Sequence, residues 1–184
     1  MDQRVVLIQS RRLAGIFLAS VILGTGINSA GINAAIAATS KSVTGAFGQV
    51  VSVPKVKVSG KAQLLVTGKG FDETIGIYLA YCLLPKKGTA PTPCGGGANK
   101  DGVGEASYWI SSNAPPYASG LAIPFQAGGR FAQTLAITKK IGDVNCTKVR
   151  CAIAVRSDHL HEGDRTNDLF IPIKFVKKLS IKKS

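Results

Sequence analysis

Apolar residues between positions 50 and 176 fall into short runs separated by Gly, Pro, Asn and Asp. No part of this region sustains an apolar repeat at helical spacing, and β-branched or aromatic runs bounded by turn residues are typical of strands. The predicted strands are residues 50–59, 62–68, 76–84, 106–111, 130–138, 149–157 and 168–176, with 121–125 as a candidate eighth. This pattern predicts an all-β fold, a seven-stranded antiparallel sandwich of the immunoglobulin-like kind.

The first of these runs changes its apolar phase at a proline. Val51 and Val53 precede Pro54, whereas Val56 and Val58 follow it, so the alternation slips by one residue. Because proline cannot donate a ladder hydrogen bond, a proline at such a slip predicts an edge strand with a kink or a bulge.

The first 37 residues have the order of a secretory signal. Three arginines and a single acid in residues 1–12 precede an apolar run at 13–27, and small residues then lead to an A-x-A pattern at Ala35 and Ala37. The apolar run is shorter than the roughly 20 residues that span a bilayer. The sequence therefore predicts cleavage after Ala37, with an uncleaved membrane anchor as the alternative.

The remaining chain is expected to be one exported domain. Residues 38–48 form a small-residue lead-in that we expect to be loose, residues 49–176 form the sandwich domain, and residues 177–184 form a basic tail. The chain carries 23 basic and 10 acidic residues and a formal charge of +13, most of which the exported part keeps. We expect a monomer that is secreted or otherwise extracytoplasmic, with association to the cell surface as an option.

Four cysteines would meet an oxidising compartment after export, where disulfides persist. They allow three connectivities. Pairing Cys82 with Cys94 and Cys146 with Cys151 places each bridge across a short loop, where the two bridges would contribute about 3 and about 2 kcal/mol in the chain-entropy model. A four-cysteine zinc site is the competing interpretation, and the eleven residues between Cys82 and Cys94 argue against it.

The segments around these cysteines resemble a known family. The strand IYLAYC with its loop to Cys94, the segment DVNCTKVRCAIAVRSD, and residues 56–71 (VKVSGKAQLLVTGKGF) are similar to the neocarzinostatin family of antibiotic apoproteins. The resemblance covers roughly residues 48–176. It implies a secreted immunoglobulin-like sandwich with two local disulfides that match the local pairing above.

The resemblance also implies a function. Members of that family hold an apolar enediyne chromophore in a cleft without covalent attachment and release it to damage DNA, which makes an antibiotic-carrier or antimicrobial role the corresponding expectation, with DNA only as an indirect partner. Fold alone does not fix function. Three positions of the implied cleft are occupied here by Tyr78, Leu84 and Arg156, where the family has an acid, a tryptophan and a small hydroxyl residue.

Aromatic residues gather in the proline-rich segment 107–125. Tyr117 and Phe125 are candidates for a wall of the cleft, because aromatic side chains offer large contact areas to apolar ligands. Trp109, in the same segment, is expected to fill the sandwich core. The predicted cleft is therefore bounded by the 82–94 loop, the 107–125 segment and the 156–168 hairpin.

Two further features support alternative functions. His159 and His161 would share a face if their strand continued, which makes them candidates for haem or metal capture, although solvated turn residues are the commoner interpretation. The basic residues Lys174, Lys177, Lys178, Lys182 and Lys183 could bind an anionic envelope polymer and make the chain a structural or adhesive protein, or they could simply form a solvated tail.

No catalytic motif supports an enzyme. The chain has neither a G-x-S-x-G elbow nor a G-x-x-x-x-G-K-[ST] phosphate loop. The leading hypothesis is a secreted, non-catalytic binding module that needs no cofactor and holds a small apolar or aromatic ligand non-covalently.

Overall fold

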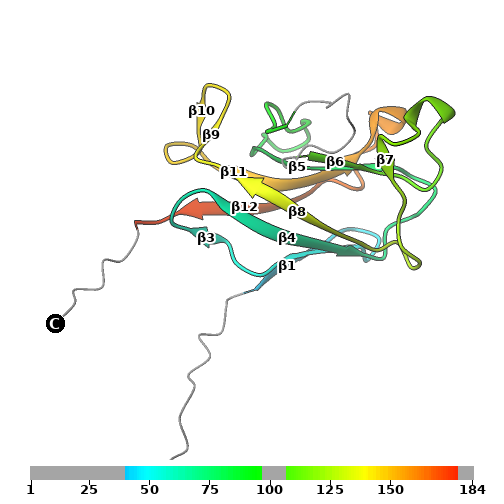
Figure 1. The fold of residues 1–184 in the computed structure, drawn as a ribbon, viewed down its shortest axis with the longest axis horizontal. Coiled ribbons are helices and arrows are strands. Elements are labelled where there is room, and N and C mark those ends of the chain that lie inside the picture. Colours follow the sequence, from blue (N-terminus) through cyan, green and yellow to red (C-terminus); the bar gives the residue numbers. More distant parts are fainter. Residues whose placement is uncertain (1–39, 97–106, 178–184) are drawn as a thin grey trace, which may run out of the picture. The chain divides into compact units, whose positions relative to one another are not determined.

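The computed structural model describes residues 40–96 and 107–177, and the predicted signal peptide lies outside them. Two sheets pack face to face (Figure 1). One has four strands in the order β1 (Lys41–Thr44), β2 (Val50–Val53), β4 (Ala62–Lys69) and β8 (Phe131–Ile137). The other has six strands in the order β3 (Lys57–Val58), β12 (Leu169–Phe175), β11 (Cys151–Ser157), β5 (Ile77–Leu83), β6 (Ser107–Ile110) and β7 (Ala122–Ile123).

The remaining elements are short. Strands β9 (Lys140–Ile141) and β10 (Val144–Asn145) form a separate hairpin, and two 3-10 turns, η1 (Pro116–Ala118) and η2 (His159–His161), lie in loops. No α-helix occurs in the two described stretches, and none of their helical turns is long and apolar enough to cross a membrane. The all-β sandwich predicted from the sequence is confirmed.

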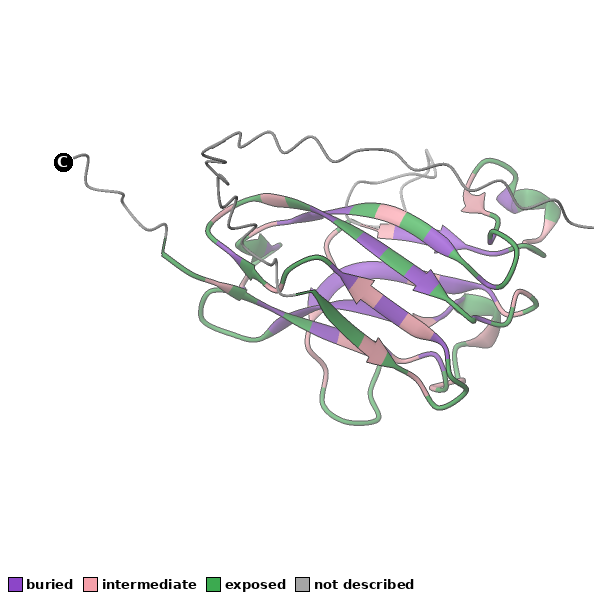
Figure 2. Cartoon of the chain, turned by 90° about the horizontal axis from the view of Figure 1, so that it is seen from below, coloured by how far each residue is buried: buried purple, intermediate pink, exposed green. Residues whose placement is uncertain are grey.

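Strict alternation of buried and exposed residues explains why the sheets pair as they do. Along β4 the residues Leu64, Val66 and Gly68 are buried, whereas those between them are exposed. Figure 2 shows this alternation along the strands. Since successive side chains of a strand point to opposite faces, each sheet has one apolar face, and the two apolar faces meet in the core.

The core contains side chains from every long strand of both sheets. Its largest fully buried members include Tyr81, Leu64, Ile77, Leu79, Ile110, Leu135, Ile137, Ile153 and Ile171. Burying a side chain of this size contributes about 1.5–3 kcal/mol. These positions are the apolar half of the alternating runs in the sequence.

The proline at the phase slip marks a change of sheet. Val51 and Val53, before Pro54, are buried residues of β2 in the four-stranded sheet. Val58, after Pro54, is a buried residue of β3 in the six-stranded sheet. The predicted strand 50–59 is therefore two strands, β2 and β3, and the exposed Pro54 lies where the chain crosses from one sheet to the other.

Three features differ from the sequence-based expectation. Residues 41–44, assigned to a loose lead-in, form β1 and pair with β2. The candidate eighth strand is present as β7, but β7 pairs with β6 in parallel, as β3 does with β12. The sandwich is thus antiparallel except at both edges of the six-stranded sheet.

Candidate functional site

The outer face of the six-stranded sheet presents a row of large side chains. Cross-strand pairing places Arg156 opposite Tyr78, and Tyr78 opposite Trp109. Directly paired residues point to the same face of a sheet. The residues next to them in the chain, Ile77, Leu79 and Val155, belong to the core, so this row points away from the core.

Four rings gather at this row, and we call them the aromatic cluster: Tyr78, Trp109, Tyr117 and His159. The imidazole centroid of His159 lies 4.9 Å from the Trp109 ring, 5.9 Å from the Tyr78 ring and 6.5 Å from the Tyr117 ring. The Tyr78 and Trp109 centroids are 6.1 Å apart. These separations lie within the range of favourable aromatic contacts.

The two tyrosine hydroxyls hold the imidazole from both sides. The Tyr78 hydroxyl is hydrogen-bonded to Nδ1 of His159, and the Tyr117 hydroxyl lies 2.9 Å from Nε2. Each ring nitrogen of the imidazole therefore has a hydroxyl partner, and which nitrogen donates depends on the tautomer. Burial, and then the nearby Asp158 carboxylate, raise the pKa of Tyr78, so its hydroxyl stays protonated at neutral pH.

A cation completes the row. The guanidinium carbon of Arg156 lies 5.7 Å from the centroid of the Tyr78 ring, within cation–π range. Arg156 and Tyr78 are both half-buried, whereas Tyr117 is 64% exposed. The cluster therefore combines apolar ring faces with hydroxyl groups and a positive charge at the protein surface.

The buried side chain of Asp158 supports the aromatic cluster through hydrogen bonds. Its fully buried carboxylate accepts hydrogen bonds from Trp109 Nε1 at 2.9 Å and from the backbone N–H of Leu160 at 3.1 Å, and it lies 3.0 Å from Nδ1 of His161. Asp158 is also the N-cap of η2, the turn that carries His159. One carboxylate thus fixes both the indole ring and the turn, since a buried charge is stable only when it is fully hydrogen-bonded.

Small side chains border the cluster on the same sheet face. Ala80, Cys82 and Ala154 are buried there, and the half-buried Cys94 and Phe170 pack against them. The Cys82–Cys94 disulfide anchors the loop that follows β5 to this face. The area beside the rings is therefore apolar and is backed by a rigid central part of the sheet.

Of the five residues expected to line a cleft, three meet. Tyr78, Tyr117 and Arg156 lie at the aromatic cluster. Leu84 follows the far end of β5, six residues from Tyr78, which at roughly 3.3 Å per residue places it about 20 Å away. Phe125 is 7% exposed and lies in the core with its ring centroid 6.1 Å from that of Phe71, so we do not include it in the site.

Sequence reasoning missed two members of the cluster. Trp109 was expected to fill the sandwich core. It is buried, with 9% of its surface exposed, but it lies on the opposite face of β6 from Tyr108 and Ile110, which belong to the central core cluster. The alternation of the strand SYWI indicates this, because Trp109 stands between two residues that point to the other face. His159 was considered for haem or metal capture or as a solvated turn residue, and nothing in the sequence shows that Tyr78 and Tyr117, which are 81 and 42 residues earlier in the chain, contact it.

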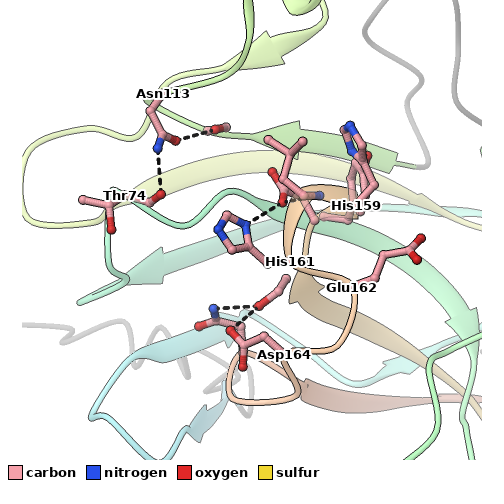
Figure 3. A network of polar contacts seen from close by, with 12 residues as sticks. Thr74, Asn113, His159, His161, Glu162 and Asp164 are labelled. Carbon is pink, nitrogen blue, oxygen red and sulfur yellow. Dashed lines mark hydrogen bonds and ion pairs between the residues drawn. The ribbon is translucent and has the colours of Figure 1, made fainter.

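The two histidines do not share a face. Strand β11 ends at Ser157, and the η2 turn separates the rings of His159 and His161, as Figure 3 shows. His161 pairs with Asp158, whereas His159 contacts the two tyrosines. Within residues 40–96 and 107–177 no group of three or more His, Cys, Asp or Glu side chains is placed to hold a metal ion.

Both predicted disulfides are present, Cys82–Cys94 and Cys146–Cys151, and no cysteine is free. The local pairing is therefore confirmed over the other connectivities and over the zinc site. Of the basic residues proposed to contact an anionic surface, Lys174 and Lys177 are exposed, and Lys178, Lys182 and Lys183 lie outside the described residues.

A cavity of about 510 Å³ lies elsewhere, over the four-stranded sheet. It is lined by residues of β2, β4, β8 and the adjoining hairpin: Val50, Ser52, Thr67, Gly68, Lys69, Gln126, Arg130, Phe131 and Ala132. None of the five residues predicted to line a cleft is among them.

Comparison with known proteins was made by sequence and by structure. No protein-family model matches the chain, and no curated protein matches it. Among solved structures the chain is similar to macromomycin, at 15% sequence identity and a TM-score of 0.44, over 70% of this chain and 99% of that one.

Proposed function

We propose that this protein is a non-catalytic carrier that holds a small aromatic ligand against the aromatic cluster on the outer face of its six-stranded sheet. The observation that carries the proposal is the gathering of Tyr78, Trp109, Tyr117 and His159 outside the central core cluster. Tyr117 and His159 are exposed and Tyr78 is half-buried beside the buried Trp109, so their grouping outside the central core is better explained by binding.

The chemistry of the cluster indicates the kind of ligand. Ring faces favour a planar apolar body, and hydroxyl groups orient it through hydrogen bonds. Arg156, beside Tyr78, favours a negatively charged or strongly electron-rich substituent at that end of the ligand. We therefore expect an aromatic compound that carries an acidic or polar group.

The proposal assigns no chemical step to these residues. Each ring nitrogen of His159 contacts a tyrosine hydroxyl, and the Asp158 carboxylate is occupied by hydrogen bonds with Trp109, Leu160 and His161. This arrangement orients side chains and does not activate a nucleophile. Two disulfides within the sandwich favour an oxidising compartment, so we place the carrier outside the cytoplasm.

Trp109 makes the proposal directly testable, because it is the only tryptophan of the chain. The probe is 8-anilinonaphthalene-1-sulfonate, which is aromatic and anionic, and binding is read as energy transfer from Trp109 during a titration. The folded wild-type protein should show saturable transfer. Tyr78→Ala and Arg156→Ala should each weaken binding at least tenfold while the circular dichroism spectrum is unchanged.

Thr67→Ala is the matched control, since Thr67 is exposed on β4 of the four-stranded sheet and lines the cavity there, whereas the aromatic cluster lies on the six-stranded sheet. This variant should bind the probe as the wild type does. The proposal fails if the wild type does not bind, or if Thr67→Ala weakens binding and Tyr78→Ala does not.

A further inference from the structure

The charges of the chain are divided unevenly along the sequence. Residues 40–71 and 169–184 contain no Asp or Glu, yet each segment contains five lysines. All acidic residues other than Asp2 lie between these two segments. A segregation of this kind creates a strong field only if the fold brings the two basic segments together.

The fold does bring them together. β3, from the first segment, pairs in parallel with β12, from the second, and Lys57 lies directly opposite Lys174. Figure 1 shows β3 beside the red end of β12. Lys55 precedes Lys57 by two residues, Lys177 follows Lys174 by three, and both are also exposed. We call Lys55, Lys57, Lys174 and Lys177 the basic edge.

No ion pair among the described residues compensates the charge of the basic edge. Like charges directly opposite one another in a sheet repel and destabilise it. In the described part of the chain the ion pairs are His161–Asp158 and Arg165–Asp168, and neither includes a residue of the basic edge. The edge therefore keeps an unfavourable arrangement that an external anion would relieve.

We propose that the basic edge binds a linear polyanion whose repeating charged groups are phosphates. Lysine ammonium groups act as point charges that do not impose the planar geometry of arginine, which suits a flexible chain of phosphates. Lys55 and Lys57 are two residues apart in the chain and both are exposed, so they can contact neighbouring groups of such a polymer.

Recognition by charge alone distinguishes this partner from single-stranded nucleic acid. Proteins that bind single strands stack bases on exposed aromatic rings. The aromatic residue beside the basic edge, Phe175, is partly buried and packs against the core. The proposal is independent of ligand binding at the aromatic cluster, which lies at the opposite end of β11 and β5 from this edge.

The test compares two charge reversals of equal size in the full chain, Lys57→Glu and Lys86→Glu. Lys86 is exposed in the loop after β5 and lies outside the basic edge. Binding of inorganic polyphosphate is measured at several salt concentrations. Lys57→Glu should weaken binding about tenfold. It should also reduce the slope of log affinity against log salt concentration by the equivalent of at least one phosphate contact. Lys86→Glu should change the affinity less than twofold.

A second measurement separates binding from the simple protection of a sheet edge, a role that exposed lysines also have. The carboxylate introduced by Lys57→Glu would face Lys174, so this variant should unfold at a higher urea concentration than the wild type while binding polyphosphate less tightly. The proposal is overturned if the wild type does not bind polyphosphate, if both reversals weaken binding equally, or if an oligothymidine of equal charge binds more tightly.

Discussion

The indole nitrogen of Trp109 donates a hydrogen bond of 2.9 Å to Oδ2 of Asp158, a carboxylate that is fully buried. This contact joins β6 to the η2 turn, 49 residues later in the chain. It is possible because Gly76, whose carbonyl oxygen accepts a hydrogen bond from the backbone N–H of Asp158, leaves room for the carboxylate. A Cβ at position 76 would overlap Oδ2.

Gly76→Ala should therefore displace Asp158 and lower the free energy of unfolding by about 1–3 kcal/mol, as overpacking of a filled site does. The environment of Trp109 should change with it, which is measured as a shift of tryptophan emission. Gly60→Ala is the control, because nothing lies within 4 Å of the added Cβ, and its effect should stay within about 0.5 kcal/mol. Equal effects of the two substitutions would contradict this account of the turn.

Tyr81 carries a buried hydroxyl that has no hydrogen-bond partner among the residues that the structure describes. Such a group lowers stability by roughly 1–3 kcal/mol, so Tyr81→Phe should raise the free energy of unfolding at pH 7 by about 1 kcal/mol. Urea denaturation measures the difference. A loss of stability in Tyr81→Phe would show that the hydroxyl is satisfied.

The same residue should make the free energy of unfolding fall at alkaline pH. Burial raises the pKa of Tyr81 to about 12, above the value of 10.0 expected when the chain is unfolded. Because the folded state binds this proton more tightly, the stability that this proton contributes is fully present below about pH 10 and is lost as the pH rises towards 12. The wild type should lose on the order of 2 kcal/mol more than Tyr81→Phe over this range. Parallel pH profiles of the two proteins would contradict the assignment.

The two disulfides should differ in their effect on stability. Cys82–Cys94 closes a loop of sequence separation 12 and Cys146–Cys151 one of 5. In the chain-entropy model, replacing each pair by alanine should lower the free energy of unfolding by about 3 and about 2 kcal/mol, respectively. Cys82 is also buried on the face that adjoins the aromatic cluster, so only the first replacement should weaken probe binding. The reverse order of binding losses would argue against the site.

Arg156 should discriminate ligands by charge. Arg156→Met keeps an extended side chain of apolar character but removes the cation over the Tyr78 ring. Affinity for 8-anilinonaphthalene-1-sulfonate should fall about tenfold, whereas affinity for its uncharged analogue N-phenyl-1-naphthylamine should change little, since a close charged contact is worth about 1.4 kcal/mol or more. Equal losses for both probes would mean that Arg156 acts through packing alone.

The sandwich was predictable because each strand has an apolar face that must be buried. The runs at 62–68, 130–138 and 168–176 agree with β4, β8 and β12 to within a residue at either end. The short strands β1, β9 and β10 were not predicted. Two to four residues show no clear period, and Lys41–Thr44 joins a sheet because its backbone pairs with β2.

The candidate site was only partly predictable. Tyr78 and Arg156 could be placed on one sheet face from strand alternation and from the family resemblance. His159 joins them because β11 ends at Ser157 and the Asp158 carboxylate caps the following turn, a tertiary arrangement that depends on Trp109 across the sheet. Sequence spacing does not reveal such a contact, because it joins residues on different strands through one buried group.

The central claim, that the aromatic cluster holds a small guest, is tested most directly by native mass spectrometry of the unreduced protein. It should be purified under non-denaturing conditions from the cells that produce it naturally. The account predicts an added small-molecule mass on the wild type that is absent from a Tyr78→Ala, Tyr117→Ala double variant made in the same cells. A wild type without any added mass, or a double variant that retains the same guest, would contradict it.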